Sequence, residues 1–193
     1  MIARCLDLTT AVDRIGATFD GDRPAGEMNS WGNSYPAEEL PFGRETVVDG
    51  IRYALVGKSP GGGAQPDHLE ALGQRLRLPH GLQAEALAVL AAGELGPQEL
   101  SVRLHLDSGG TTSGTCVSVT IPGWMARPDA PRAADQLRCS HLHYPGDYGL
   151  ALLLPVLWSR RLPLGGVPVV AVDLLTNPLV HVFAVTLLSK AAA

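Results

Sequence analysis

The feature that most constrains the fold is an apolar run near the end of the chain, residues 179–188, with the sequence LVHVFAVTLL. Asn177 and Pro178 mark its start. Its valines and threonine are β-branched, which restricts their side-chain torsions in a helix and favours a strand. Because the run has no polar face, we expect a strand that is buried on both sides. Such a strand needs partners, which the preceding chain must supply.

Several earlier segments alternate apolar and polar residues, as strands with one solvent-exposed face do. One of them contains Asp49 followed by Gly50, a pair typical of a tight hairpin turn. Two others are separated by a turn-rich stretch and predict a second antiparallel hairpin. The strand candidates before the final run are residues 45–55, 74–79, 100–106, 115–121, 150–158 and 167–175.

Residues 84–94 fit two structures. Ala, Leu and Glu in this segment are strong helix formers. The apolar run at 87–92 is equally consistent with a central buried strand. Since strand candidates outnumber this one segment, the predicted fold is all-β: an antiparallel β-sandwich or jelly roll with at most one short helix.

Length and composition indicate a single globular domain over residues 1–193. The chain is 46% hydrophobic and 18% charged, which is ordinary for a folded globule, and its 22 glycines and 15 prolines imply many turns. A net charge of −4 gives no reason to expect nucleic acid or an anionic membrane as a partner. With no visible export signal and three cysteines expected to be free thiols, the predicted location is cytoplasmic.

Residues 19–42 form a long segment without a strand or helix pattern. It is rich in Asp, Gly, Asn, Ser and Pro and contains Trp31 and Tyr35. Irregular loops of this length are uncommon unless they bind something or pack as a specific cap. We therefore expect a binding loop here.

Five stretches together resemble a β-sandwich module found beside glycoside hydrolase domains in actinobacterial secreted enzymes. The resemblance covers most of the chain from Gly16 onward. Modules of this kind are similar to galactose-binding-like jelly rolls. The resemblance implies carbohydrate binding and, in some members, a structural calcium ion. The stretches are FDG at 19–21, NSYPAEELP at 33–41, QPDH at 65–68 with GQ at 73–74, IPGW at 121–124, and LVHVFAVTL at 179–187.

The chain departs from that pattern in three ways. It stands without a catalytic domain, it lacks an export signal, and residues 23–28 are inserted in the first loop. An intracellular small molecule, such as a sugar-decorated metabolite, is therefore a better expected ligand than a secreted polysaccharide.

Asp20 and Asp22 lie two residues apart in a glycine-containing loop. Calcium takes several oxygen ligands, and alternate acidic residues in a turn can supply them. Aspartates also occur in loops because they cap turns through their own backbone, and the pattern favours this second interpretation. The cofactor expectation is accordingly none, or a structural Ca²⁺ at Asp20 and Asp22.

His141, His143 and Tyr144 form the densest polar cluster of the sequence. In an extended chain the two histidines point to the same face, so they could bind one metal ion or flank one substrate. Paired histidines on an exposed strand edge are the simpler alternative. If they are functional, His141, His143 and Tyr144 are the predicted catalytic residues.

Large aromatic side chains could provide a platform for a sugar ring. Trp31 is the best exposed candidate because it is flanked by polar loop residues, whereas Trp124 and Trp158 are expected in the core. His181 is expected to be a hydrogen-bonded core histidine. The predicted ligand-binding residues are Trp31, Asn33, Tyr35 and Asp147.

Two functions remain open. The first is a lectin-like binding module for a carbohydrate or glycosylated small molecule. The second is an intracellular enzyme of specialised metabolism, a lyase, cyclase or hydrolase, that uses His141 and His143 for acid–base or metal chemistry. In either case, residues 19–42 and 141–148 are predicted to meet at one end of the sandwich, where loops can vary without disturbing the core. The sequence does not indicate an oligomeric state.

Overall fold

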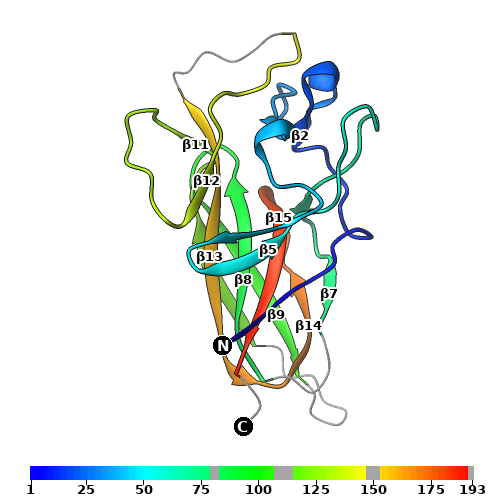
Figure 1. The fold of residues 1–193 in the computed structure, drawn as a ribbon. Coiled ribbons are helices and arrows are strands. Elements are labelled where there is room, and N and C mark those ends of the chain that lie inside the picture. Colours follow the sequence, from blue (N-terminus) through cyan, green and yellow to red (C-terminus); the bar gives the residue numbers. More distant parts are fainter. Residues whose placement is uncertain (79–82, 107–114, 147–152, 191–193) are drawn as a thin grey trace.

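The computed structural model describes residues 1–78, 83–106, 115–146 and 153–190. Its largest sheet is antiparallel and is built around the apolar strand β8 (Figure 1). The strand order is β1 (Ile2–Cys5), β15 (Asn177–Ser189), β8 (Ala84–Gly93), β13 (Leu154–Val167) and β11 (Met125–Ala126), with β6 (Leu69–Ala71) on β15 and β12 (Gln136–Arg138) on β13.

A second antiparallel sheet packs behind the first. Its order is β10 (Cys116–Ile121), β9 (Gln98–Leu106), β14 (Val169–Leu174) and β7 (Arg75–Arg77). The hairpin of β4 (Glu45–Val48) and β5 (Ile51–Ala54) crosses the opposite face of the first sheet (Figure 1). The remaining elements are the short parallel pair β2 (Ala17–Thr18) and β3 (Tyr35–Pro36), and the 3₁₀ segments η1 (Asp20–Ala25) and η2 (Ala37–Glu39).

The prediction of an all-β sandwich is confirmed. Helical residues in the described ranges are confined to η1 and η2. The segment that fits both helix and strand, residues 84–94, is strand β8. Its helix propensity is overridden because β13 and β15 pair with its two edges, and only a central strand can bury both of its faces.

The first sheet separates two hydrophobic cores, so its central strands are apolar on both faces. On β8, Leu87 and Val89 alternate with Ala88 and Leu90, and the two pairs belong to opposite cores. The final strand does the same. This explains why residues 179–188 show no polar face and confirms that β15 is buried on both sides.

Strand β15 bulges at Phe183. The register passes from Val182 opposite Ala91 to Ala184 opposite Leu90, which leaves Phe183 without a direct partner on β8. The Phe183 ring is fully buried and packs edge-on against Tyr35.

Both predicted hairpins are present. Strands β4 and β5 pair across Asp49 and Gly50, and both residues have the positive φ angles that a tight hairpin turn requires. Strands β9 and β10 pair antiparallel from Cys116 opposite Arg103 to Ile121 opposite Gln98.

The cysteines are free thiols, as expected, but only Cys139 is buried, and Cys116 is exposed. Burial raises the pKa of the Cys139 thiol well above its ordinary value. None of the helical segments in the described ranges is long and apolar enough to cross a membrane.

Candidate functional site

The loop at residues 19–42 and the histidine segment meet, as the sequence predicted. Ser34 and His143 form an antiparallel bridge in which each backbone N–H donates to the other residue's carbonyl at 3.0 Å. This bridge lies next to the β2–β3 pair, which joins the residues on either side of the segment 19–34. The contact brings Asp20 close to residues 141–143, although more than 100 residues separate them in the sequence.

We call Asp20, His141 and His143 the histidine cluster. The His141 Nε2 and His143 Nε2 atoms are 3.2 Å apart, and Asp20 Oδ1 is 3.2 Å from His143 Nε2. The ring of His143 is fully buried, whereas the side chain of Asp20 is 56% exposed. The cluster therefore lies at the surface with one buried wall.

Each histidine ring is held through its other nitrogen. His141 Nδ1 lies 2.9 Å from the Glu39 carboxylate, which is itself fixed by the backbone N–H and the hydroxyl of Ser140. His143 Nδ1 lies 3.0 Å from the Thr18 hydroxyl, which in turn contacts the Ser34 hydroxyl at 2.6 Å. These outer contacts fix both ring orientations.

Burial, and next the neighbouring His141, lower the pKa of His143 from its ordinary value. The neutral imidazole is thereby favoured, and this is the form that binds a metal ion. Asp22, which the sequence paired with Asp20 as a calcium ligand, is not a member of the cluster of potential metal ligands found among the described residues.

The predicted aromatic residues differ in their positions. Trp31 is 69% exposed, as expected, and Trp124 is buried against Tyr35, also as expected. Tyr35, however, is fully buried and its hydroxyl donates to the Val156 carbonyl at 2.9 Å. The expectation that Tyr35 faces a ligand is corrected: its ring packs against Trp124 and Phe183 in one core.

Tyr144 is exposed beside the histidine cluster. Asn33 is buried, and its side-chain oxygen has no hydrogen-bond partner among the described residues. Asp147 lies outside the described residues. The catalytic roles expected for His141, His143 and Tyr144 stay predictions.

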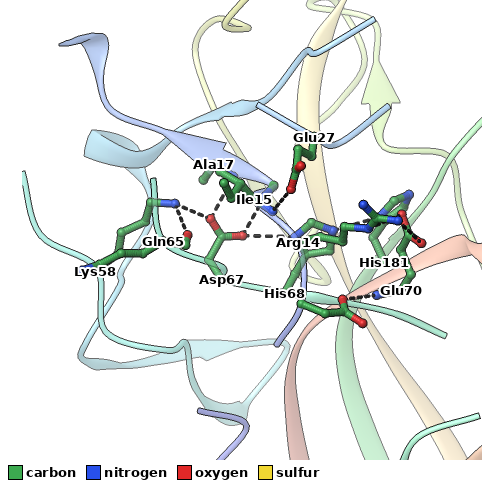
Figure 2. Close-up of polar contacts among 12 residues, drawn as sticks. Arg14, Ile15, Ala17, Glu27, Lys58, Gln65, Asp67, His68, Glu70 and His181 are labelled. Carbon is green, nitrogen blue, oxygen red and sulfur yellow. Dashed lines mark hydrogen bonds and ion pairs between the residues drawn. The ribbon is translucent and has the colours of Figure 1, made fainter. Parts of the chain in front are cut away.

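A second polar group, which the sequence did not indicate as a site, is buried between the loop and the first sheet (Figure 2). Its centre is the carboxylate of Asp67, which is fully buried. Asp67 accepts hydrogen bonds from the Gly16 and Ala17 amides at 2.9 and 3.0 Å and from Lys58 Nζ at 2.6 Å. It also lies 3.1 Å from His68 Nδ1. The donors around this carboxylate come from three segments of the chain: Gly16 and Ala17, Lys58, and His68.

The Asp67 contact sets the tautomers of two neutral histidine rings in turn. A carboxylate can only accept, so His68 donates from Nδ1 and leaves its Nε2 as an acceptor. His181 Nδ1 lies 3.0 Å from that atom and must therefore donate to it. The Nε2 atom of His181 then carries an unshared lone pair. We call Asp67, His68 and His181 the buried relay (Figure 2).

The relay ends beside a cavity. His181 Nε2 is buried, has no hydrogen-bond partner among the described residues, and lies 3.6 Å from the Glu94 carboxylate. Burial, and next Glu70, raise the pKa of Glu94. Glu94 lines a surface cavity of about 350 Å³, together with Arg14, Gly26, Glu27, Asn29, Ser30, Gly32 and Glu70.

Gly16 is required where the relay meets the bulge of β15. A Cβ atom at this position would lie 2.6 Å from both His68 Nδ1 and Phe183 Cζ. The ring of His68 stacks on Phe183 with centroids 4.7 Å apart. Only a residue without a side chain fits against this stacked pair.

The sequence did contain a signal for the relay. His181 was expected to be a hydrogen-bonded core histidine, and the structure confirms this. A buried imidazole needs polar partners, and Asp67 and His68 immediately precede the buried β6 residue Leu69. That polar pair beside an apolar strand was the available clue.

The model of the AziU2-like beta-sandwich domain matches residues 4–191. The chain belongs to this family. AziU2-like membership agrees with the two-sheet architecture and covers both the histidine cluster and the buried relay. A search of curated proteins finds no match to this AziU2-like chain.

Proposed function

We propose that this AziU2-like protein binds a carbohydrate or a glycosylated small molecule in the cavity beside Trp31. The observation that carries the proposal is the position of Trp31 between Ser30 and Gly32, which both line the cavity. An exposed indole at the rim of a polar cavity can cover the apolar face of a sugar ring. Of the other two tryptophans, Trp124 is buried and Trp158 is half-buried.

The polar groups of the cavity suit a ligand with several hydroxyl groups. Glu27, Glu70 and Glu94 offer carboxyl oxygens, and Asn29 offers an amide. Arg14 is held in place by Glu70, with Nε 3.1 Å from Oε1. A few oriented polar groups beside an aromatic ring are the usual composition of a small-molecule site.

The buried relay supports the same proposal because it ends beside Glu94, which lines the cavity. Glu94, whose pKa is raised, can donate a hydrogen bond when protonated, and His181 Nε2 offers an acceptor behind it. Because the lone pair of His181 is set by Asp67, the acceptor has a fixed direction. Glu94 therefore lies at the cavity wall with this acceptor behind it, and its carboxyl group can contact a polar group of the ligand.

The test is a binding measurement with defined sugars. A panel of hexoses, amino sugars and their methyl glycosides is titrated while tryptophan fluorescence and calorimetric heat are recorded. We expect at least one member to bind, and Trp31→Ala and Glu94→Gln each to weaken it by roughly tenfold or more, the loss of one good contact of about 1.4 kcal/mol.

Val47→Ala is the matched control, because Val47 is exposed on β4 and lies outside the cavity. It should leave the affinity unchanged. Binding by no panel member, or binding that survives both cavity substitutions, would show that this proposal is wrong.

A further inference from the structure

The histidine cluster brings together three atoms that can each present a lone pair. His141 Nε2, His143 Nε2 and Asp20 Oδ1 all lie within 4.8 Å of one another, and two of the separations are 3.2 Å. Asp20 belongs to η1, whereas the two histidines belong to residues 141–143. The fold, and not local sequence, creates the arrangement.

The outer contacts direct both Nε2 lone pairs inward. Glu39 can only accept, so His141 donates to it from Nδ1, and the neutral His141 ring then offers Nε2 as a ligand atom. His143 Nδ1 can likewise donate to Thr18, whose hydroxyl can donate onward to Ser34. His143 Nε2 lies 3.2 Å from both His141 Nε2 and Asp20 Oδ1, so a shared proton or a bound cation can occupy the space between these three atoms.

We propose that Asp20, His141 and His143 bind a divalent first-row transition-metal ion. Zn²⁺ is the ion that fits these three ligands best. Metal–nitrogen bonds in zinc sites are about 2.0–2.1 Å, so two nitrogens at a tetrahedral angle lie roughly 3.3 Å apart. The 3.2 Å separation of the two Nε2 atoms matches that spacing. This inference is independent of the sugar-binding proposal and uses none of the residues that line the cavity.

The second contacts of each ring are those of a metal site. Histidines that bind metals usually pass their other N–H to a carboxylate, a carbonyl or water, which orients the ring and raises its basicity. Glu39 does this for His141, and Ser140 holds Glu39 in turn. Thr18 takes the corresponding place for His143.

The donor set identifies the class of ion. Two imidazole nitrogens and one carboxylate oxygen suit zinc, cobalt or iron, whereas calcium prefers oxygen ligands alone. Arg23 Nη1 lies 3.7 Å from Asp20 Oδ1, so an ion competes with this guanidinium for the carboxylate. Three protein ligands are the number found in catalytic zinc sites, which can polarise a bound oxygen.

The test uses tag-free full-length protein, treated with a chelator and dialysed, then titrated with Zn²⁺, Co²⁺ and Ca²⁺. We expect one equivalent of Zn²⁺, a rise in melting temperature, and a visible absorption band with Co²⁺. His141→Gln and Asp20→Asn should each weaken Zn²⁺ binding at least 100-fold. Glu39→Gln should weaken it about 10- to 100-fold through ring orientation alone.

Two matched variants separate this site from adventitious binding. His105→Gln removes another histidine that contacts a carboxylate, Asp173, on the second sheet. Cys116→Ser removes the exposed thiol. Both should bind Zn²⁺ as the parent does. Absence of binding, binding of Ca²⁺ alone, or a loss that appears equally in these two variants would overturn the proposal.

Discussion

At the scale of single residues, Asp67 contacts several parts of the interior, although nothing in the strand pattern of the sequence marks it as important. Its carboxylate is fully buried and pairs with Lys58, whose side chain is only 3% exposed. Removing one partner of a buried ion pair typically costs about 3–5 kcal/mol, because the other charge stays buried. The same carboxylate fixes the tautomers of His68 and His181, so one side chain sets both the stability and the polarity of the relay.

The buried relay should make the protein less stable in acid. Burial, and next the neighbouring His68 and Arg14, lower the pKa of His181 to about 3. In the unfolded chain a histidine titrates near 6.5, so between these values the unfolded state binds more protons. Stability is therefore complete above about pH 6.5 and falls as the pH drops toward 3, by up to about 1.4 kcal/mol per pH unit for this group.

Urea unfolding of the parent and of His181→Gln between pH 8 and 4 measures this effect. The parent should lose stability faster than the variant below pH 6.5. Glu94, whose raised pKa gives the opposite slope, lies 3.6 Å from His181 Nε2, so the comparison is repeated with Glu94→Gln in both proteins to remove its contribution. Parallel curves would contradict the assignment.

At the scale of elements, the strands that could be predicted either alternate in polarity, as the hairpin strands do, or are apolar throughout and rich in β-branched residues, as β15 is. The hairpins at Asp49–Gly50 and between β9 and β10 have local turns and local partners, so their alternation was informative. Strand β8 was ambiguous because both of its faces are buried, and only its neighbours decide its conformation. Local sequence contains no record of those neighbours.

The candidate sites also differ in whether their residues are close together in the sequence. His141 and His143 are two residues apart, so their common face followed from extended geometry, and Trp31 was recognisable from its polar flanks. The relay joins His68 to His181 across 113 residues, a distance that no spacing rule covers. Tyr35 was misassigned because an aromatic residue in an irregular loop looks the same whether it faces solvent or the core.

Phe183→Ala tests the bulge of β15. The ring is fully buried and contacts both Tyr35 and His68, so its removal should cost about 3–5 kcal/mol, the usual range for deleting a buried aromatic ring. Urea unfolding gives the free energy, with Val47→Ala on the exposed face of β4 as a control expected to change it by less than about 0.5 kcal/mol. A loss below about 1 kcal/mol for Phe183→Ala would show that the bulge is not a packing centre.

At the scale of the whole molecule, two cores share one sheet. Strands β8 and β15 contribute side chains to both, so neither core is complete without them. The first strand pairs with β15 from Ile2 opposite Ser189 to Cys5 opposite Thr186. Both ends of the described chain therefore lie together at one end of the sandwich (Figure 1).

A fragment of residues 1–174, which lacks β15, should show no cooperative thermal unfolding and should expose its apolar strands to a hydrophobic dye. Deleting only residues 191–193 should leave the melting temperature within a few degrees of the parent. Cooperative unfolding of the shorter fragment would mean that the two cores are independent of the strand that they share.

The position of β15 also determines when the protein can fold during synthesis. Every other described strand leaves the ribosome before β15 does, yet β1, β6 and β8 all take β15 as a hydrogen-bonded neighbour. Both hydrophobic cores of the nascent chain consequently stay incomplete, with apolar strands exposed, until residues 177–189 emerge. Until then, chaperones that bind exposed apolar strands would have to protect it from aggregation.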